Sequence, residues 1–135
     1  MADRYSLRDT NLAIVRRLLE EGFGQGQTSW LPQQVSPDYV GHLANGDHYG
    51  PEGLRIDIAG YRSKIAGLTV TIEDLFADGD MVGRRFTFRG VSCVPGVDLE
   101  LDGTDVATTG IAIDRLVDGL LMESWVQIGP LLQVR

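Results

Sequence analysis

The chain has 135 residues, of which 43% are hydrophobic and 23% charged, and its formal net charge is −7 at pH 7. This length predicts one domain, 1–135, and the composition excludes a disordered or collagen-like chain. The acidic balance argues against a nucleic-acid partner, because a phosphate-binding protein normally carries a basic face. No apolar run approaches the ~18 residues of a membrane span, so no membrane contact is expected. The N-terminus lacks a signal-peptide pattern, which predicts a cytoplasmic protein.

Helical patterns come first along the chain. A helix is predicted from about Asp9 to Glu21, where apolar residues recur at helical spacing. A short helical turn is expected around Ser29 to Gln34, and Asp38 to Leu43 is predicted to be a short strand or extended segment. The glycine-, asparagine- and aspartate-containing stretch from Ala44 to Gly50 is predicted to be a loop. A second long helix begins at Gly50-Pro51-Glu52 and ends at Gly67, because proline suits the first helical position.

From residue 68 onward the apolar residues alternate with a period of two, which predicts strands. The predicted strands are 68–76, 81–91, 104–116 and 120–128. The turn signals between them are Asp78-Gly79-Asp80, a loop with Pro95 and Gly96, Asp102-Gly103 and Asp118-Gly119. Helices followed by an antiparallel meander predict an α+β fold. A curved sheet with helices on one face would leave a concave pocket between the layers.

Several segments in this order carry a family resemblance. They are the first helix, Pro37–His42, Gly50–Leu54, Val70–Leu75, Arg85–Gly90, Thr109–Ile111 running to Asp118-Gly119, and Glu123–Trp125. The sequence resembles the SnoaL-like polyketide cyclases of the nuclear transport factor 2-like superfamily. The resemblance implies a cone-shaped α+β barrel, a curved and mainly antiparallel sheet wrapped around N-terminal helices, assembled as a homodimer. The superfamily includes aldol cyclases, cofactor-free hydroxylases, epoxide hydrolases, ether-ring-forming cyclases and ketosteroid isomerases, so it implies a range of chemistries.

His42 is the first candidate for a catalytic role. Ketosteroid isomerases carry a carboxylate base at what resembles its position, and an imidazole titrates near neutral pH, as a general base should. The alternative is a partly buried histidine that is hydrogen-bonded to the surrounding structure. Asp38 lies on the same face of the predicted strand and could orient His42. However, the two α-carbons would be ~13 Å apart in an extended chain, and Ser36-Pro37-Asp38 is also a turn signature.

Further candidates lie on the predicted strands. Asp114 could act as an acid in an apolar pocket, or could be a surface charge near the Asp118-Gly119 turn. Arg85 lies on the strand face opposite Phe86 and Phe88. The resemblance favours an inward Arg85, where it would stabilise developing negative charge; the alternative is a solvated arginine. Asp105 could lie at the mouth of the pocket or could be an ordinary loop charge.

The remaining expectations concern ligand contacts. Substrate contacts are predicted for a set of large or inward-facing side chains together with Asp105: Trp30, Tyr61, Trp125, Val126 and Asp105. In SnoaL-like aldol cyclases the essential aspartate aligns with Val126, which cannot transfer a proton. His48 is expected to be exposed or to form part of a lid. The chain has two histidines and one cysteine, Cys93, and lacks a helical histidine pair or a phosphate loop. Neither a metal nor another cofactor is therefore expected.

The leading hypothesis is a cofactor-free cyclase that acts on a polyketide-type intermediate of bacterial secondary metabolism. It would promote ring closure, dehydration or isomerisation by acid–base catalysis, with His42 as base. One alternative is an epoxide-opening or ether-ring-forming cyclase that uses paired carboxylates, Asp38 with Asp105 or Asp114. Another is a non-catalytic module for small-molecule binding or dimerisation, which the valine at position 126 favours.

Overall fold

The computed structural model describes residues 4–93 and 102–134. Its helical elements are α1 (Arg4–Arg17), the π-helical η1 (Leu18–Phe23), α2 (Leu31–Gln34) and α3 (Gly50–Lys64). Its strands are β1 (Val35–Leu43), β2 (Gly46–Tyr49), β3 (Ile65–Asp78), β4 (Met81–Ser92), β5 (Asp105–Val117), β6 (Leu120–Ile128) and β7 (Leu132–Gln133). The predicted α+β class is confirmed. No helix within the two described ranges is long and apolar enough to cross a membrane.

Two short strands differ from the sequence-based expectation. The stretch predicted to be a loop, 44–50, contains β2, which pairs with β1 as a tight hairpin whose register joins Leu43 to Gly46. Gly46 has a φ of 125°, a conformation that favours glycine and lets the chain reverse after two turn residues. β7 pairs with the start of β5. The predicted loop at Pro95 and Gly96 lies outside the described residues.

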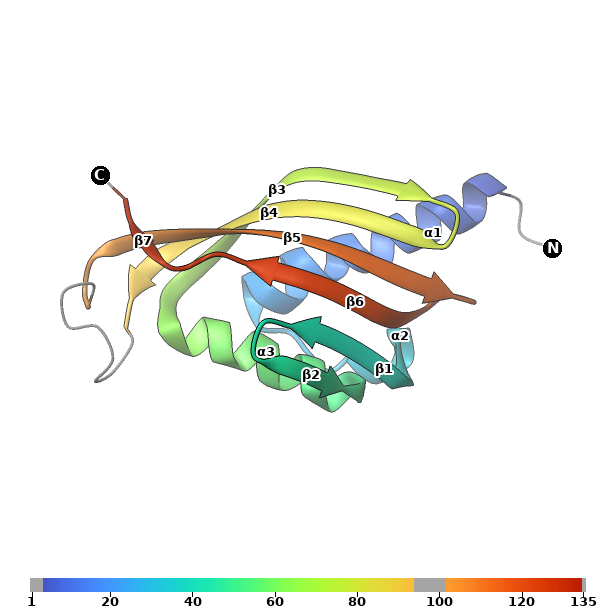
Figure 1. The fold of residues 1–135 in the computed structure, drawn as a ribbon, viewed down its shortest axis with the longest axis horizontal. Helices are drawn as coiled ribbons and strands as arrows, with labels where there is room; N and C mark the ends of the chain where they lie inside the picture. Colours follow the sequence, from blue (N-terminus) through green and yellow to red (C-terminus); the bar gives the residue numbers. More distant parts are fainter. Residues whose placement is uncertain (1–3, 94–101, 135) are drawn as a thin grey trace.

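The strands form one curved sheet in the order β2-β1-β6-β5-β4-β3, with β7 beside β5. All pairs are antiparallel except β1 with β6, which is parallel. The resemblance implied a barrel, but the sheet does not close, because β2 and β3 remain its two edges. Figure 1 shows α1 and α3 together on one side of this sheet. That helix-covered side is called the inner face below.

The core lies between the inner face and the helices. Phe86 and Phe88 of β4 are almost completely buried there, as are Leu18 of η1 and Ile58 of α3. An added Cβ at Gly110 on the neighbouring strand would lie 2.4 Å from the Phe86 ring, so this close packing requires glycine. Burial of the two phenylalanines fixes which face of β4 turns inward.

The expectation that Arg85 points inward is therefore wrong. Arg85 follows the opposite alternation to Phe86 and Phe88 and is exposed on the outer face. Its Nε donates to Asp74 of β3 at 2.7 Å, and both side chains are at least half exposed. Arg84 is the inward arginine of this strand, only 4% exposed. The buried arginine of β4 is therefore Arg84, one residue before the expected Arg85.

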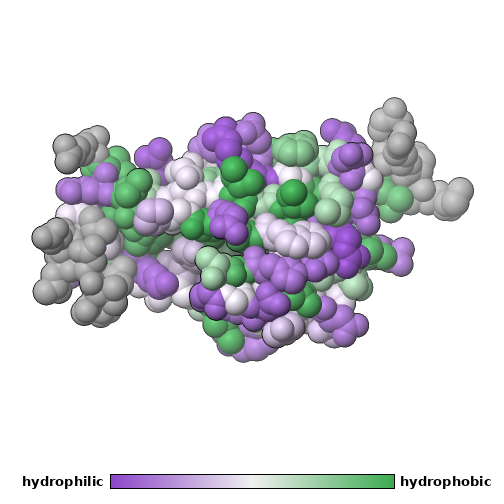
Figure 2. All heavy atoms as spheres, viewed as in Figure 1, coloured by the Kyte–Doolittle hydropathy of each residue, from purple (hydrophilic) through white to green (hydrophobic). Residues whose placement is uncertain are grey.

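The outer face of the sheet carries exposed apolar side chains. Ile111 and Ile113 of β5 and Trp125 of β6 are 59%, 46% and 41% exposed. Figure 2 shows this side of the molecule, where apolar side chains gather among polar ones over the middle of the sheet. A contiguous exposed apolar patch on a soluble protein commonly marks a contact surface.

Candidate active site

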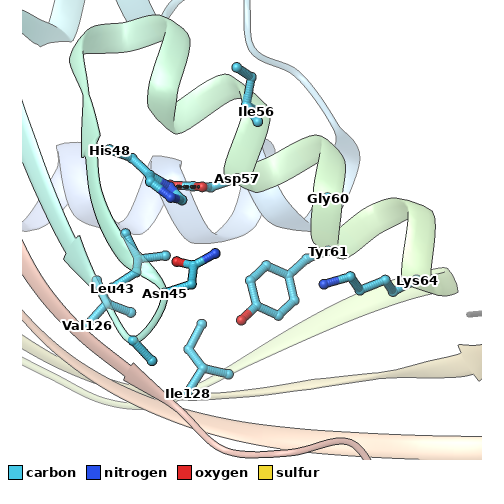
Figure 3. A pocket seen from close by; sticks show the side chains of 11 residues that line it. Leu43, Asn45, His48, Ile56, Asp57, Gly60, Tyr61, Lys64, Val126 and Ile128 are labelled. Carbon is cyan, nitrogen blue, oxygen red and sulfur yellow. Dashed lines mark hydrogen bonds and ion pairs between the residues drawn. The ribbon is translucent and has the colours of Figure 1, made fainter. Parts of the chain in front are cut away.

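A pocket of about 370 Å³ opens between α3, the β1–β2 hairpin and the end of β6. We call it the outer pocket. Figure 3 shows side chains from all three elements pointing into it. The principal lining residues are Leu43, Asn45 and His48 from the hairpin, Asp57, Tyr61 and Lys64 from α3, and Val126 and Ile128 from β6. The lining is mixed, with an apolar floor and wall and a small set of polar groups, as in most small-molecule sites.

A histidine and a carboxylate form a hydrogen-bonded pair in this pocket. His48 Nδ1 lies 2.5 Å from Asp57 Oδ1, and the Asp57 side chain is only 7% exposed. The close approach depends on Gly53, where an added Cβ would lie 3.2 Å from the His48 backbone. Burial raises the pKa of Asp57, and the hydrogen bond from His48 opposes that rise. Nε2 of His48 has no hydrogen-bond partner among the described residues and is available to a ligand.

Asp57, Tyr61 and Lys64 share one face of α3, because they are four and three residues apart. The Tyr61 ring packs edge-on against Phe88 with the ring centroids 5.5 Å apart. Burial raises the pKa of Tyr61, so its hydroxyl remains a hydrogen-bond donor at neutral pH. Nζ of Lys64 lies 5.7 Å from the Tyr61 ring centroid, at the side of the pocket. This face of α3 therefore supplies an acceptor, a neutral donor and a cation.

The pocket continues inward as a recess of only about 20 Å³. We call it the inner recess. It shares Asp57 and Tyr61 with the outer pocket and adds Tyr39 of β1 and Arg84 of β4. Burial raises the pKa of Tyr39 to about 12, although a hydrogen bond with Ser124 opposes the rise. The recess is otherwise lined by apolar side chains, so these four residues supply all of its polar side-chain groups.

Behind the inner recess lies a buried ion pair. Arg84 donates to both oxygens of Asp114, from Nε to Oδ2 at 2.9 Å and from Nη2 to Oδ1 at 3.1 Å. The Ser124 hydroxyl also donates to Oδ1, at 2.6 Å. Asp114 is fully buried and lines neither the outer pocket nor the inner recess. The expected acid thus holds Arg84 in place, because both of its oxygens are already hydrogen-bonded within the protein.

His42 does not line the pocket. Tyr39 and Gly41, on either side of Val40 in β1, are buried, so alternation turns His42 to the outer face. There Nδ1 lies 2.9 Å from Asp47 and Nε2 lies 2.6 Å from Glu123. The hydrogen bond to Glu123 raises the pKa of His42 the most, and the hydrogen bond to Asp47 raises it further. The expectation of an inward His42 is corrected: its two ring nitrogens are engaged at the surface.

Two other expected catalytic or contact residues also lie away from the pocket. Asp38 is exposed at the surface, where its backbone N–H is held by the Ser36 hydroxyl at 3.0 Å. Asp105 is exposed at the start of β5 beside a different surface hollow. The structure therefore does not bring Asp38, Asp105 and Asp114 into one cavity, and the carboxylate pair of the first alternative function is not formed.

The expected contact residues divide into two groups. Tyr61 and Val126 line both the outer pocket and the inner recess. Trp30 instead lies in the core, where its Nε1 donates to the Gln27 carbonyl at 2.7 Å. Trp125 lies on the outer face and stacks on His42 with the ring centroids 5.6 Å apart. The binding role of Tyr61 and Val126 stays a prediction.

Sequence reasoning missed Asp57 and Arg84 as pocket residues and expected His48 to be exposed or to form part of a lid. A signal existed for Asp57, which lies three residues after Leu54 and four before Tyr61 and so interrupts an apolar helical stripe. A signal also existed for Arg84, which shares the alternation of Phe86. No local signal identifies His48, because its position depends on the hairpin packing against α3.

Comparisons with known proteins agree with this architecture. A family model described as SnoaL-like polyketide cyclase matches residues 13–133. A candidate SnoaL-like polyketide cyclase from Jannaschia sp. CCS1 is 22% identical, with a TM-score of 0.80 over 95% of this chain and 91% of that chain. TsrD from Streptomyces laurentii is 24% identical, with a TM-score of 0.76 over 95% and 91% of the two chains. IdmH from Streptomyces antibioticus, a candidate polyketide cyclase, is 23% identical, with a TM-score of 0.75 over 87% and 91%.

No curated protein matches the chain. Because the structural neighbours are less than 25% identical, they show the fold alone, which is of the nuclear transport factor 2-like type with a curved sheet and N-terminal helices. The family model spans most of the sequence. The chain belongs to the SnoaL-like polyketide cyclase family.

Proposed function

We propose that the protein is a cofactor-independent cyclase or isomerase that acts on a polyketide-type ketone in the cytoplasm of a bacterium. The observation that carries the proposal is the His48–Asp57 pair in the outer pocket. A ketone fits the mixed lining, because its carbon skeleton contacts the apolar floor and its oxygen needs only a few donors. The family membership supports a polyketide-like ligand.

The geometry supports proton transfer by His48. Asp57 accepts a hydrogen bond from the Nδ1–H group of His48, which fixes the imidazole tautomer. The Nε2 lone pair is then free to accept a proton from a carbon next to a carbonyl group. Asp57 then stabilises the resulting imidazolium, as the carboxylate of a histidine–carboxylate pair does. The enolate formed can close a ring, lose a leaving group or be reprotonated at another carbon. His48 returns the proton, so no external reagent is consumed.

A model ketone tests the proposed proton transfer directly. The bicyclic ketone 2-tetralone exchanges its α-protons for deuterium in D₂O, and ¹H NMR follows the loss of signal. We expect the wild-type protein to accelerate this exchange and His48→Asn to lower the catalysed rate by about 10²- to 10⁴-fold, the usual contribution of a general base. Asp57→Asn should lower it as well, because the imidazole loses its orienting acceptor.

The second histidine provides a matched control. His42→Asn removes an imidazole from the same hairpin, but from the outer face, and should leave the exchange rate within about twofold of wild type, because His42 does not line the pocket. An exchange rate equal to that in buffer would contradict the proposal. A loss of activity in the His42 variant that spares the His48 variant would contradict it equally.

Val126 favours a second candidate function. It lines the outer pocket on β6, at the position that the resemblance assigns to the essential aspartate of the aldol cyclases. Without that carboxylate the pocket could bind a small molecule and leave it unchanged. In that case 2-tetralone should stabilise the protein against heat while its exchange rate stays that of the solvent, which separates binding from catalysis.

The outer face supports a homodimer as part of the proposal. Ile111, Ile113 and Trp125 form an exposed apolar surface that no helix of the described residues covers. A second copy of the chain can bury the same surface across a twofold axis, since such an interface is self-complementary. Dimerisation through the outer face would leave the outer pocket open, because that pocket lies beside α3 on the inner, helix-covered side of the sheet.

A further inference from the structure

The inner recess is unusual in its size and its polarity. Its volume of about 20 Å³ is small beside the 370 Å³ of the outer pocket. The recess therefore suits a small terminal group of a ligand, such as a single oxygen atom, and is too small for its carbon skeleton. Four polar side chains face this small space, whereas most of its wall is apolar. Such a narrow polar end beside a wide pocket selects for the terminal atom of a ligand.

The polar groups of the inner recess differ in whether their hydrogen-bonding atoms already have partners within the protein. Arg84 uses Nε and Nη2 on Asp114, and no hydrogen bond joins its Nη1 to another described residue. The Tyr61 hydroxyl likewise has no hydrogen-bond partner among the described residues, and Figure 3 shows it pointing into the cavity. Tyr39 is engaged with Ser124, and Asp57 with His48. The free donors of the recess are therefore Arg84 Nη1 and the Tyr61 hydroxyl, since the hydrogen bond of Asp57 to His48 uses Oδ1.

We infer that the inner recess receives a single carbonyl oxygen of the ligand, to which the Arg84 guanidinium and the Tyr61 hydroxyl donate hydrogen bonds. This inference rests on the proposed function, since negative charge develops on that oxygen as His48 takes the adjacent proton. Donors held in a buried recess stabilise such a charge strongly, because they need no reorganisation and no water competes with them. Asp114 and Ser124 act as positioning residues that hold Arg84 toward the recess.

The ion pair also defines the class of ligand. Arg84 and Asp114 together carry no net charge, so they attract a free carboxylate weakly while still presenting N–H groups at short range. A ketone that becomes an enolate matches this environment, whereas a carboxylic acid or phosphate end does not. The ligand should enter with a ketone at its narrow end and extend its skeleton into the outer pocket beside His48.

Three perfluorinated rings test the recess without any turnover. Pentafluorophenolate carries one anionic oxygen, hexafluorobenzene replaces that oxygen by fluorine, and pentafluorobenzoate carries a carboxylate. ¹⁹F NMR titration gives the Kd of each. We expect wild-type protein to bind pentafluorophenolate about tenfold or more tightly than either of the other two, which is the effect of one or two charge-assisted hydrogen bonds.

Variants assign that preference to residues. Tyr61→Phe, and the paired change of Arg84→Met with Asp114→Leu, should each reduce the preference for the phenolate about tenfold and leave the Kd of hexafluorobenzene within about twofold. The paired change avoids a buried unpaired charge, and Tyr61→Phe preserves the test if the pair fails to fold. The control is Arg85→Met with Asp74→Leu, which removes an exposed ion pair on the outer face of the sheet. This change should leave the preference for the phenolate unchanged.

Failure of this inference can be told apart from failure of the proposed function. His48→Asn should lose the 2-tetralone exchange and keep the phenolate preference, because it leaves both donors in place. A wild-type protein that binds pentafluorophenolate no better than hexafluorobenzene would overturn the inference. So would a preference that survives both Tyr61→Phe and the paired change, whatever the exchange rate.

Discussion

The buried Arg84–Asp114 pair makes a quantitative prediction about stability. Asp114→Leu removes the acceptor of two Arg84 hydrogen bonds and leaves a guanidinium that is only 4% exposed without a counter-charge. Breaking a buried ion pair from one side costs about 3–5 kcal/mol, since the remaining charge has neither water nor a partner. The chain then loses a large part of the 5–15 kcal/mol that is typical of a folded domain.

The paired change should recover most of this loss. In Arg84→Met with Asp114→Leu no charge remains to be desolvated, and such apolar replacements of buried pairs are often neutral or stabilising. The Ser124 hydroxyl loses Asp114 as an acceptor in this variant but keeps its hydrogen bond with Tyr39. We expect the double variant to lie within about 2 kcal/mol of wild type, although each position is almost fully buried.

Urea unfolding followed by far-UV circular dichroism measures both variants. With a slope of about 2 kcal/mol per molar urea for a domain of this size, Asp114→Leu should lower the midpoint by about 2 M and the double variant by less than half as much. Arg85→Met with Asp74→Leu serves as the exposed control and should change stability by less than about 1 kcal/mol. A single variant that loses less than about 1 kcal/mol, or a double variant as unstable as the single one, would refute the reasoning.

Three further predictions concern the hairpin and the outer face. Hydrogen bonds to Glu123 and Asp47 raise the pKa of His42, so the contribution of His42 to stability should be complete below the ordinary pKa of 6.5 and disappear as the pH rises through the raised value. NMR titration of the imidazole measures the pKa, and urea midpoints against pH measure the stability. This pH dependence should be absent in His42→Gln. Gly41→Ala should cost about 1–3 kcal/mol, because the new Cβ would lie 2.8 Å from the Tyr39 hydroxyl, and Tyr39→Phe should relieve most of that cost in a double-mutant cycle. Ile113→Glu should convert a dimer to monomers in sedimentation velocity without loss of the native circular dichroism spectrum; a wild-type monomer would refute the dimer.

The sequence groups the residues of β5 and β6 by face correctly, because side chains alternate along a strand. Period-two alternation put Asp114 on one face of β5 and grouped Ser124 with Val126 on β6, and both groupings are found in the structure. Alternation alone does not say which face is inside. On β4 the two phenylalanines decide, because burying each aromatic side chain contributes about 1.5–3 kcal/mol. Arg84 shares the strand face of Phe86, so the two buried phenylalanines also identify the inward arginine of β4.

The site itself was less predictable than the fold. Asp57 interrupts the apolar stripe of α3, and a carboxylate at such a position indicates either a partner or a function. Its partner His48 comes from a four-residue strand within a stretch that has only turn residues as local signals. Whether His42 or His48 faces the pocket depends on the tertiary contact of the hairpin with α3, which no local pattern in the sequence records.

The parallel pairing of β1 with β6 has a consequence for the order of folding. It joins His42 to Trp125, two residues separated by most of the chain, and the outer pocket is walled on one side by the hairpin and on the other by Val126 and Ile128. Such long-range contacts close a large loop before they contribute stability, so they form late. During synthesis the helices and the β1–β2 hairpin emerge first, with the pairing edge of β1 still unoccupied. The pocket is therefore expected to assemble late, because a chain that stops before β6 lacks the wall that Val126 and Ile128 provide.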